Sequence, residues 1–168
     1  VQIGKITPNK GDRVVNLTGK YLMPGLINLH VHLPAGGKPR NKPMNTNRLT
    51  KIALSSGLSR ALVLRMCHAY AMQGLLSGVT TVRVVGGLDN LDTRLRDRIH
   101  AGKLDGPRIL AANYAIGVPH GHMVGSVTHP AETVEDAVRM VDQLHGQNVD
   151  LIKLMITGGV MDAKVKGE

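Results

Sequence analysis

The chain alternates between segments with a helical period of apolar residues and short apolar segments typical of strands. Residues 134–145 carry apolar side chains three and four positions apart, the stripe of a helix that lies on a core. Thr133 and Asp136 give this helix a Thr-x-x-Asp capping pattern at its start. Helices are also predicted over residues 59–77, which are rich in Ala, Leu, Met and Arg, and over residues 91–101.

Four predicted strands alternate with these helices, over residues 26–33, 79–85, 108–112 and 149–156. The order predicts parallel strands joined by crossover helices. In such folds the loops after the carboxyl ends of the strands build the active site. Three of the strands are followed by a glycine pair, which turn geometry alone would also explain: Gly36-Gly37, Gly86-Gly87 and Gly158-Gly159.

The remaining segments are predicted as turns, loops and short strands. Residues 1–20 contain short apolar stretches between Pro and Gly residues, which predict small strands with tight turns. Residues 34–47 form a long polar loop, and loops of that length are often functional. Residues 113–130 are predicted to be irregular and contain three histidines.

Composition narrows the class of protein. A length of 168 residues suits one globular domain, and a core of Leu, Val, Ile, Ala and Met follows from an aromatic content of only 2%. Lys and Arg number 21 against 12 Asp and Glu, which gives a net charge of +9. These basic residues are spread along the chain without an aromatic platform for bases, so we expect no nucleic-acid partner.

Cysteine usage and hydropathy point to a cytoplasmic protein. The single cysteine, Cys67, excludes an internal disulfide, which argues against a small secreted scaffold. No apolar run approaches the ~20 residues that span a bilayer, so no membrane partner is expected. The chain shows no basic-then-apolar signal pattern at its start, although it begins at Val1 without Met.

His30 and His32 are the first candidate site residues, because they lie two positions apart on a predicted strand. Side chains at that spacing point to the same side of a strand. Two neutral imidazoles side by side can chelate one divalent metal, and zinc sites need three or four ligands. The alternative is an ordinary pair of partly buried polar residues.

Further polar side chains lie near the same predicted rim: Arg83 late in the second strand, His120 and His122 after the third, and Lys153 within the fourth. A buried ammonium ion is costly, so an apolar strand favours the neutral amine of Lys153. A neutral amine is a nucleophile that can add carbon dioxide, giving an anionic carbamate able to bridge two metals. The alternative is a lysine that extends from the strand end into solvent.

Three segments together resemble the metal-dependent amidohydrolase superfamily. They are residues 19–33 with the His-x-His pair, residues 78–87 with Gly-Val-Thr-Thr-Val-Arg and the glycine pair, and residues 150–161 with the strand lysine. The third segment is similar to the branch that holds prolidase-like enzymes and Xaa-Arg or Xaa-Lys dipeptidases. The resemblance implies an α/β fold, a (β/α)8 TIM-type barrel, with residues 23–168 as about its first four units. Residues 1–22 would contribute to a small β-sandwich.

The resemblance also implies the chemistry. His30 and His32 would bind the more buried of two Zn2+ ions, and Lys153, carboxylated by CO2, would bridge both. A zinc-bound hydroxide would then attack the amide carbon of a dipeptide or related small substrate. His122 corresponds to a family Gly-Gly-His turn, so we expect it to bind substrate together with Arg83 and His120, although the last position is usually glycine in that family.

Two substitutions and the length depart from the family pattern. Asn28 and Val84 stand where the family usually has Asp; neither position is normally a metal ligand, but both can affect how ligands are oriented. The family's remaining metal-binding histidines and its catalytic aspartate lie on later strands, beyond Glu168. We therefore expect no catalytic residue in this chain, and an inactive N-terminal half of an enzyme.

Two other hypotheses remain open at this stage. A single-metal deaminase or imidazolonepropionase-like hydrolase would leave Lys153 unmodified. A non-catalytic half-barrel would instead bind a partner through its exposed strand edges. The sequence is compatible with a homo-oligomer and does not define its size.

Overall fold

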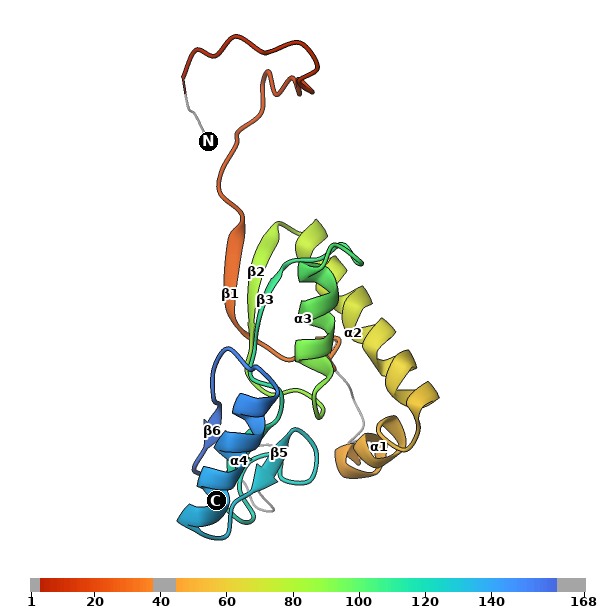
Figure 1. Cartoon of the computed structure of the whole chain (residues 1–168), viewed down its shortest axis with the longest axis vertical. Helices are drawn as coiled ribbons and strands as arrows, with labels where there is room; N and C mark the ends of the chain where they lie inside the picture. The colour runs from red at the N-terminus through yellow and green to blue at the C-terminus, as the bar shows by residue number, and fades with distance from the viewer. Residues whose placement is uncertain (1–3, 38–44, 160–168) are drawn as a thin grey trace.

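The structure, a computed structural model, describes residues 4–37 and 45–159. It contains two three-stranded parallel sheets, one with the order β1-β2-β3 and the other with the order β5-β4-β6 (Figure 1). The strands are β1 (Leu26–Val31), β2 (Val79–Val84), β3 (Arg108–Ala111), β4 (Ala115–Gly117), β5 (Thr128–Pro130) and β6 (Leu154–Met155). The helices are α1 (Thr46–Ala53), α2 (Gly57–Leu76), α3 (Leu91–His100) and α4 (Val134–Gly146).

The first sheet is covered on one face by α2 and α3 (Figure 1). Helix α2 begins at a capping box in which the side chain of Ser56 accepts from the backbone N–H of Ser59 and the side chain of Ser59 accepts in return. The side chains between sheet and helices form a continuous apolar core, which burial stabilises. Its fully buried members are Leu33, Leu64, Cys67, Ala71, Val82, Val84, Leu88, Leu91, Leu95, Ile109 and Ala111.

The chain passes from the first sheet to the second between the end of β3 at Ala111 and the start of β4 at Ala115. Asn113, fully buried with a φ of 58°, separates β3 from β4 and turns the chain between the two sheets. A second core forms where Tyr114 and Ile116 pack against Leu144 of α4. The capping box at the start of α4 is the one that the sequence predicts, from Thr133 with its partner three residues on.

The three predicted helices are confirmed, but several strand and loop predictions are wrong. Of the fourth strand, predicted over 149–156, only the two residues of β6 form a strand, which pairs with β4. Residues 113–130 are not wholly irregular, because they contain β4 and β5. Helix α1 begins inside the predicted loop 34–47, of which residues 38–44 lie outside the described residues.

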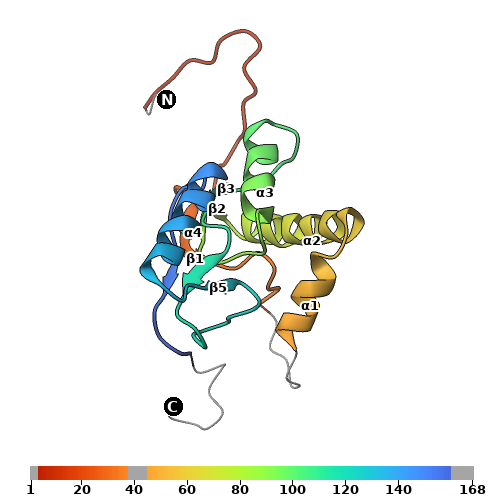
Figure 2. The same ribbon diagram turned by 60° about the horizontal axis from the view of Figure 1, so that its bottom comes forward.

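The N-terminal predictions also differ from the structure. Residues 4–25 form no strand, because a strand requires hydrogen bonds to a neighbour and none pairs with this segment here. β1 is an edge strand and its side chains are largely exposed, not buried as the apolar sequence suggests. The segment before it extends away from the two sheets (Figure 2). Among the described helices, none is long and apolar enough to cross a membrane.

Asp92 generates a prediction about stability. Burial raises the pKa of its carboxyl group from 3.8 to about 7, so the folded protein keeps this proton to higher pH than the unfolded chain. Between these pKa values the native state binds more protons than the unfolded state, so stability falls as pH rises. Three pKa units correspond to a loss of about 4 kcal/mol.

We expect Asp92→Asn to remove this pH dependence. The free energy of unfolding of the variant, relative to the wild type, should rise from about pH 4 to about pH 8, by up to about 4 kcal/mol. Urea denaturation at a series of pH values measures both proteins. Parallel curves for wild type and variant would show that Asp92 does not titrate in this window.

Candidate metal centre

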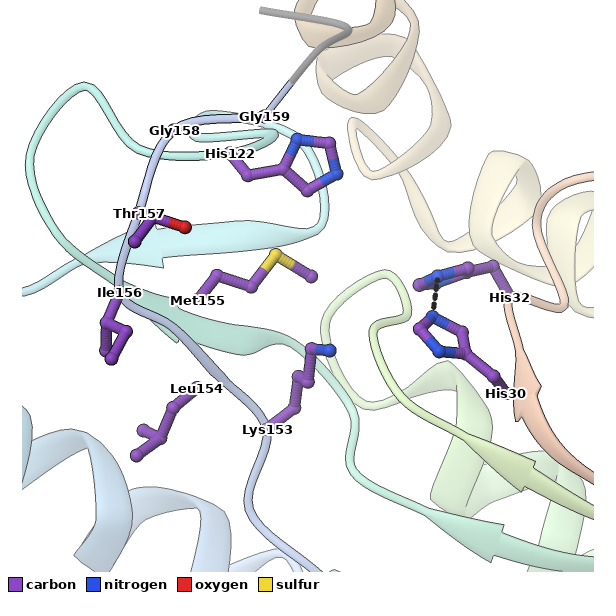
Figure 3. A pocket seen from close by; sticks show the side chains of 10 residues that line it. All are labelled: His30, His32, His122, Lys153, Leu154, Met155, Ile156, Thr157, Gly158 and Gly159. Atoms are coloured by element: carbon purple, nitrogen blue, oxygen red, sulfur yellow. Dashed lines mark hydrogen bonds between the residues drawn. The ribbon is translucent and has the colours of Figure 1, made fainter.

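A pocket of about 330 Å³ lies beyond the carboxyl ends of β1 and β6. Side chains from distant segments line it: His30 and His32 from the end of the first strand, His122 from the loop after β4, and the segment 153–159 (Figure 3). Because all strands of both sheets are parallel, their carboxyl ends bring these segments together. This is the position in which parallel α/β folds place their ligand sites.

The two imidazoles of His30 and His32 face each other with their Nε2 atoms 3.2 Å apart (Figure 3). Two nitrogens bound to one tetrahedral zinc at the usual bond length of about 2.0–2.1 Å are about 3.3 Å apart. The pair therefore fits chelation of a single divalent ion. The backbone N–H of His30 donates to Oδ1 of Asn28 at 3.1 Å, so the amide at this position already supports the strand end.

The protonation of His32 is set by the turn after β2. Its Nδ1 lies 2.8 Å from the carbonyl oxygen of Gly86, and a carbonyl only accepts, so Nδ1 carries the proton. Nε2 of His32 is then the lone-pair nitrogen, and in the hydrogen bond between the two rings His30 is the donor. A metal ligand whose other ring nitrogen is held by a carbonyl is oriented in the way that metal sites require.

The electrostatic setting favours a neutral His30. Desolvation is the largest cause that lowers its pKa, and electrostatic interactions with His32, Lys153 and Arg83 lower it further. A histidine must be unprotonated at the ligating nitrogen to bind metal. The lowered pKa favours a neutral imidazole, whose single proton has to move from Nε2 to Nδ1 for Nε2 of His30 to bind a metal ion.

Lys153 and Met155 extend into the pocket from neighbouring positions of the same segment. The amine of Lys153 points toward the histidine pair (Figure 3). This lysine is half-buried and directly precedes the two-residue strand, so the prediction of a lysine in the middle of a buried strand is wrong. Met155 is buried, and its Sδ accepts a hydrogen bond of 3.1 Å from Oγ1 of Thr128.

His122 lies across the pocket from the histidine pair (Figure 3). Its backbone N–H donates to the carbonyl oxygen of Thr157 at 3.2 Å, which ties this loop to the segment after β6. The ring packs against Gly159, where a Cβ would lie only 1.9 Å from Nδ1 of His122. Glycine at this position thus makes room for the imidazole.

The structure brings together four of the six predicted site residues. His30, His32, His122 and Lys153 line the pocket, whereas Arg83 and His120 are absent from its lining. Nε of Arg83 donates to the carbonyl oxygen of Leu29 at 2.7 Å, so this side chain braces the first strand.

His120 and Val84, two departures from the family pattern, have clear surroundings. His120 is exposed with a φ of 58°, a left-handed conformation that favours glycine. Val84 is fully buried in the first core and is not a pocket residue. Among the described residues, no group of three His, Cys, Asp or Glu side chains could hold a metal ion. Further metal ligands therefore have to come from other residue types or from outside the described segments.

Sequence reasoning missed the carbonyl of Gly86, which accepts from Nδ1 of His32, and the side chain of Met155, which lines the pocket. The glycine pair after β2 was a signal for the first. Gly86 has a φ of 138°, and a Cβ there would lie 3.2 Å from Cε1 of His32. Besides forming a turn, Gly86 therefore allows the imidazole of His32 to approach the backbone.

Comparison with known proteins identifies the family of this chain. A model of the amidohydrolase family matches residues 21–168. The chain belongs to the amidohydrolase family. No curated protein sequence matches this member.

Solved structures resemble this amidohydrolase-family chain. One is a crystal structure of an amidohydrolase, with 26% identity and a TM-score of 0.74 over 94% of this chain and 39% of that one. A protein from Bifidobacterium longum assigned as a prolidase is 34% identical, with a TM-score of 0.58 over 85% of this chain and 29% of its own. A Xaa-Pro dipeptidase with bound methionine in its active site is 28% identical, with a TM-score of 0.57 over 81% and 34%. The chain thus spans less than half the length of each of these structures.

The contact between Gly86 and His32 generates a prediction. We expect Gly86→Ala to push the ring of His32 away and to lower the affinity for cobalt(II), used as a spectroscopic substitute for zinc, at least about tenfold. Gly78→Ala is the matched control, because Gly78 also has a positive φ, 98°, but nothing lies within 4 Å of its Cβ position. Both variants should lose about 1 kcal/mol or more of stability from backbone strain.

Cobalt titration and thermal unfolding measure the two effects separately. An equal cobalt affinity in the Gly86 and Gly78 variants would show that the contact between Gly86 and His32 does not matter for metal binding.

Proposed function

We propose that this chain provides part of the active site of a metal-dependent amidohydrolase that cleaves an amide or peptide bond in a dipeptide or related small substrate. The observation that carries the proposal is the pair of Nε2 atoms of His30 and His32, 3.2 Å apart in a pocket that also holds Lys153. Membership of the amidohydrolase family supports it. So does the likeness to structures assigned as a prolidase and a Xaa-Pro dipeptidase.

His30 and His32 would hold one metal ion, which we propose to be Zn2+. A bound ion of this kind activates water at neutral pH and polarises the scissile carbonyl. The residues of this chain contribute orientation: the carbonyl of Gly86 keeps the proton on Nδ1 of His32, which leaves Nε2 available. Desolvation and then the nearby charged side chains lower the pKa of His30, which favours its neutral form.

Lys153 is proposed to be carboxylated and to join two metal ions. The ammonium group would first lose one proton to solvent. The lone pair of the neutral amine would then form a bond to the carbon of CO2 while one C–O π bond breaks, and a second proton would leave the nitrogen, so that a cation becomes an anion with two oxygen ligands. The direction of this side chain toward the histidine pair supports the role (Figure 3). Its partial exposure leaves a path for CO2 to reach the amine.

Substrate binding is assigned to His122, which faces the histidine pair across the pocket (Figure 3). An imidazole there can donate to a carbonyl or carboxylate oxygen of a dipeptide. Arg83 and His120, expected from the sequence to contact substrate, are not part of this assignment because neither lines the pocket. Between the two branches, Xaa-Pro substrates agree with the names of the similar structures, and Xaa-Arg or Xaa-Lys substrates remain the alternative.

The fold supports the same proposal. The parallel order β1-β2-β3 and the parallel pairing of β4 with β6 are compatible with the first part of a (β/α)8 barrel, in which β3 and β4 together would make the third position and β6 the fourth. We propose that residues 23–168 supply these units and that residues 1–22 belong to a small β-sandwich. The aspartate that catalyses the reaction in this family, with the remaining metal ligands, would come from later strands.

Lys153→Met tests the dizinc proposal. We expect the metal content to fall from near two ions per chain toward one, and amide hydrolysis by the complete enzyme to fall about a thousandfold, since a lost metal removes several kcal/mol of stabilisation. The wild type should incorporate 13C from labelled bicarbonate into a carbamate signal in NMR spectra, and the variant should not. Lys51→Met, at an exposed lysine of α1, is the control and should keep both properties.

The outcomes separate the alternatives. One metal ion per chain with no carbamate in the wild type would favour the single-metal deaminase-like hydrolase. Absence of metal from protein produced with added zinc would contradict both enzyme proposals.

A further inference from the structure

Asp92 is the most unusual ionisable residue outside the pocket. It is the second residue of α3, is only 1% exposed, and neither carboxyl oxygen has a hydrogen-bond partner among the described residues. A buried polar group without a partner is costly, and native structures contain few of them. The side chain therefore needs an explanation beyond filling the core.

The carboxyl group packs directly against Gly87. A Cβ added to Gly87 would lie 1.9 Å from Oδ2 of Asp92 and 2.5 Å from its Cγ. The space that a side chain at position 87 would occupy is thus taken by the carboxyl group of Asp92. This contact joins the start of α3 to the turn after β2.

The peptide group between Gly86 and Gly87 is the one that orients His32. Its carbonyl oxygen accepts from Nδ1 of His32 at 2.8 Å, and its N–H donates to the carbonyl oxygen of Asn113 at 2.7 Å. The peptide plane is therefore held at both polar ends. Asp92 packs against the adjacent Cα of Gly87.

Asn113 closes a ring of contacts around this peptide. Its Oδ1 accepts from the backbone N–H of Thr93 at 3.1 Å, and its Nδ2 donates to Oγ1 of the same residue at 3.2 Å. Thr93 follows Asp92 in α3. The buried side chain of Asn113 therefore fixes the beginning of the helix, and the backbone carbonyl of Asn113 holds the N–H of Gly87. Asn113 thus holds both Thr93, next to Asp92, and Gly87, against which Asp92 packs.

We propose that Asp92 is a positioning residue for His32. Its carboxyl group holds the Gly86-Gly87 peptide in the orientation that keeps the proton of His32 on Nδ1 and directs Nε2 toward His30. The role rests on the proposed function only in that it gives His32 the task of binding metal. The contact acts through shape, and the raised pKa of this buried carboxyl, about 7, agrees with a group that does not need its charge.

The test compares substitutions that keep or change the shape of the carboxyl group. Asp92→Asn is isosteric and should leave His32 as the Nδ1–H tautomer. Asp92→Ala leaves the turn unsupported, and Asp92→Glu pushes an extra methylene into Gly87, so each should give a mixture of tautomers. The glutamate variant also keeps the test valid if the alanine variant does not fold.

The tautomer is read from 15N chemical shifts of the ring nitrogens in the metal-free protein. Cobalt(II) affinity is the second measurement, with an expected loss of at least about tenfold in Asp92→Ala and Asp92→Glu. Leu95→Ala is the matched control, because Leu95 is fully buried in the same helix and its loss destabilises the core without touching the turn. In this control the tautomer should stay unchanged.

Two results would overturn the proposal: a pure Nδ1–H tautomer in both Asp92→Ala and Asp92→Glu, or an equal loss of that tautomer in Leu95→Ala. A wild type that binds no cobalt but shows the expected tautomer changes would contradict the proposed function alone and support the positioning role.

Discussion

The hydrogen bond from Nδ1 of His32 to the carbonyl of Gly86 is the interaction on which the candidate site depends. It joins the end of the first strand to the turn after the second, two segments 54 residues apart in the sequence. By fixing the proton on one ring nitrogen it makes the other available, and it thereby decides the direction of the hydrogen bond from His30. Without it, both rings could rotate, and the 3.2 Å spacing of their Nε2 atoms would be one arrangement among several.

One glycine of each glycine pair has a role besides forming a turn: it leaves room for a neighbouring ring. Gly36 lies against the ring of Tyr70, Gly86 against His32, and Gly159 against His122. Each is a place where a ring comes closer to the backbone than a Cβ would allow. Two of these rings belong to the candidate site, so the absence of side chains at the strand ends shapes the pocket as much as the side chains that are present.

Sequence patterns predicted what depends on local periodicity. A spacing of about 3.6 residues predicts the helices, and a spacing of two residues places His30 and His32 on the same side of a strand. The alternation of strands and helices predicts the parallel order. The turn at Asn113 between β3 and β4 depends on a buried side chain that binds Thr93 and on a positive φ, and neither has a periodic signal. The exposure of β1 depends on which elements cover it, and an apolar strand sequence carries no information about that.

The charges around His30 bear on the state of Lys153. After desolvation and the interaction with His32, the side chains of Lys153 and Arg83 also lower the pKa of His30, and their positive charges would repel a divalent ion placed between the rings. Arg83 is held by the carbonyl of Leu29 and keeps its charge. Lys153 is therefore the group whose chemistry can change the balance. The proposed carboxylation would replace that repulsion with attraction. No carboxylate is among the described lining residues of the pocket, so the proposed carboxylation of this lysine would be the most direct source of negative charge there.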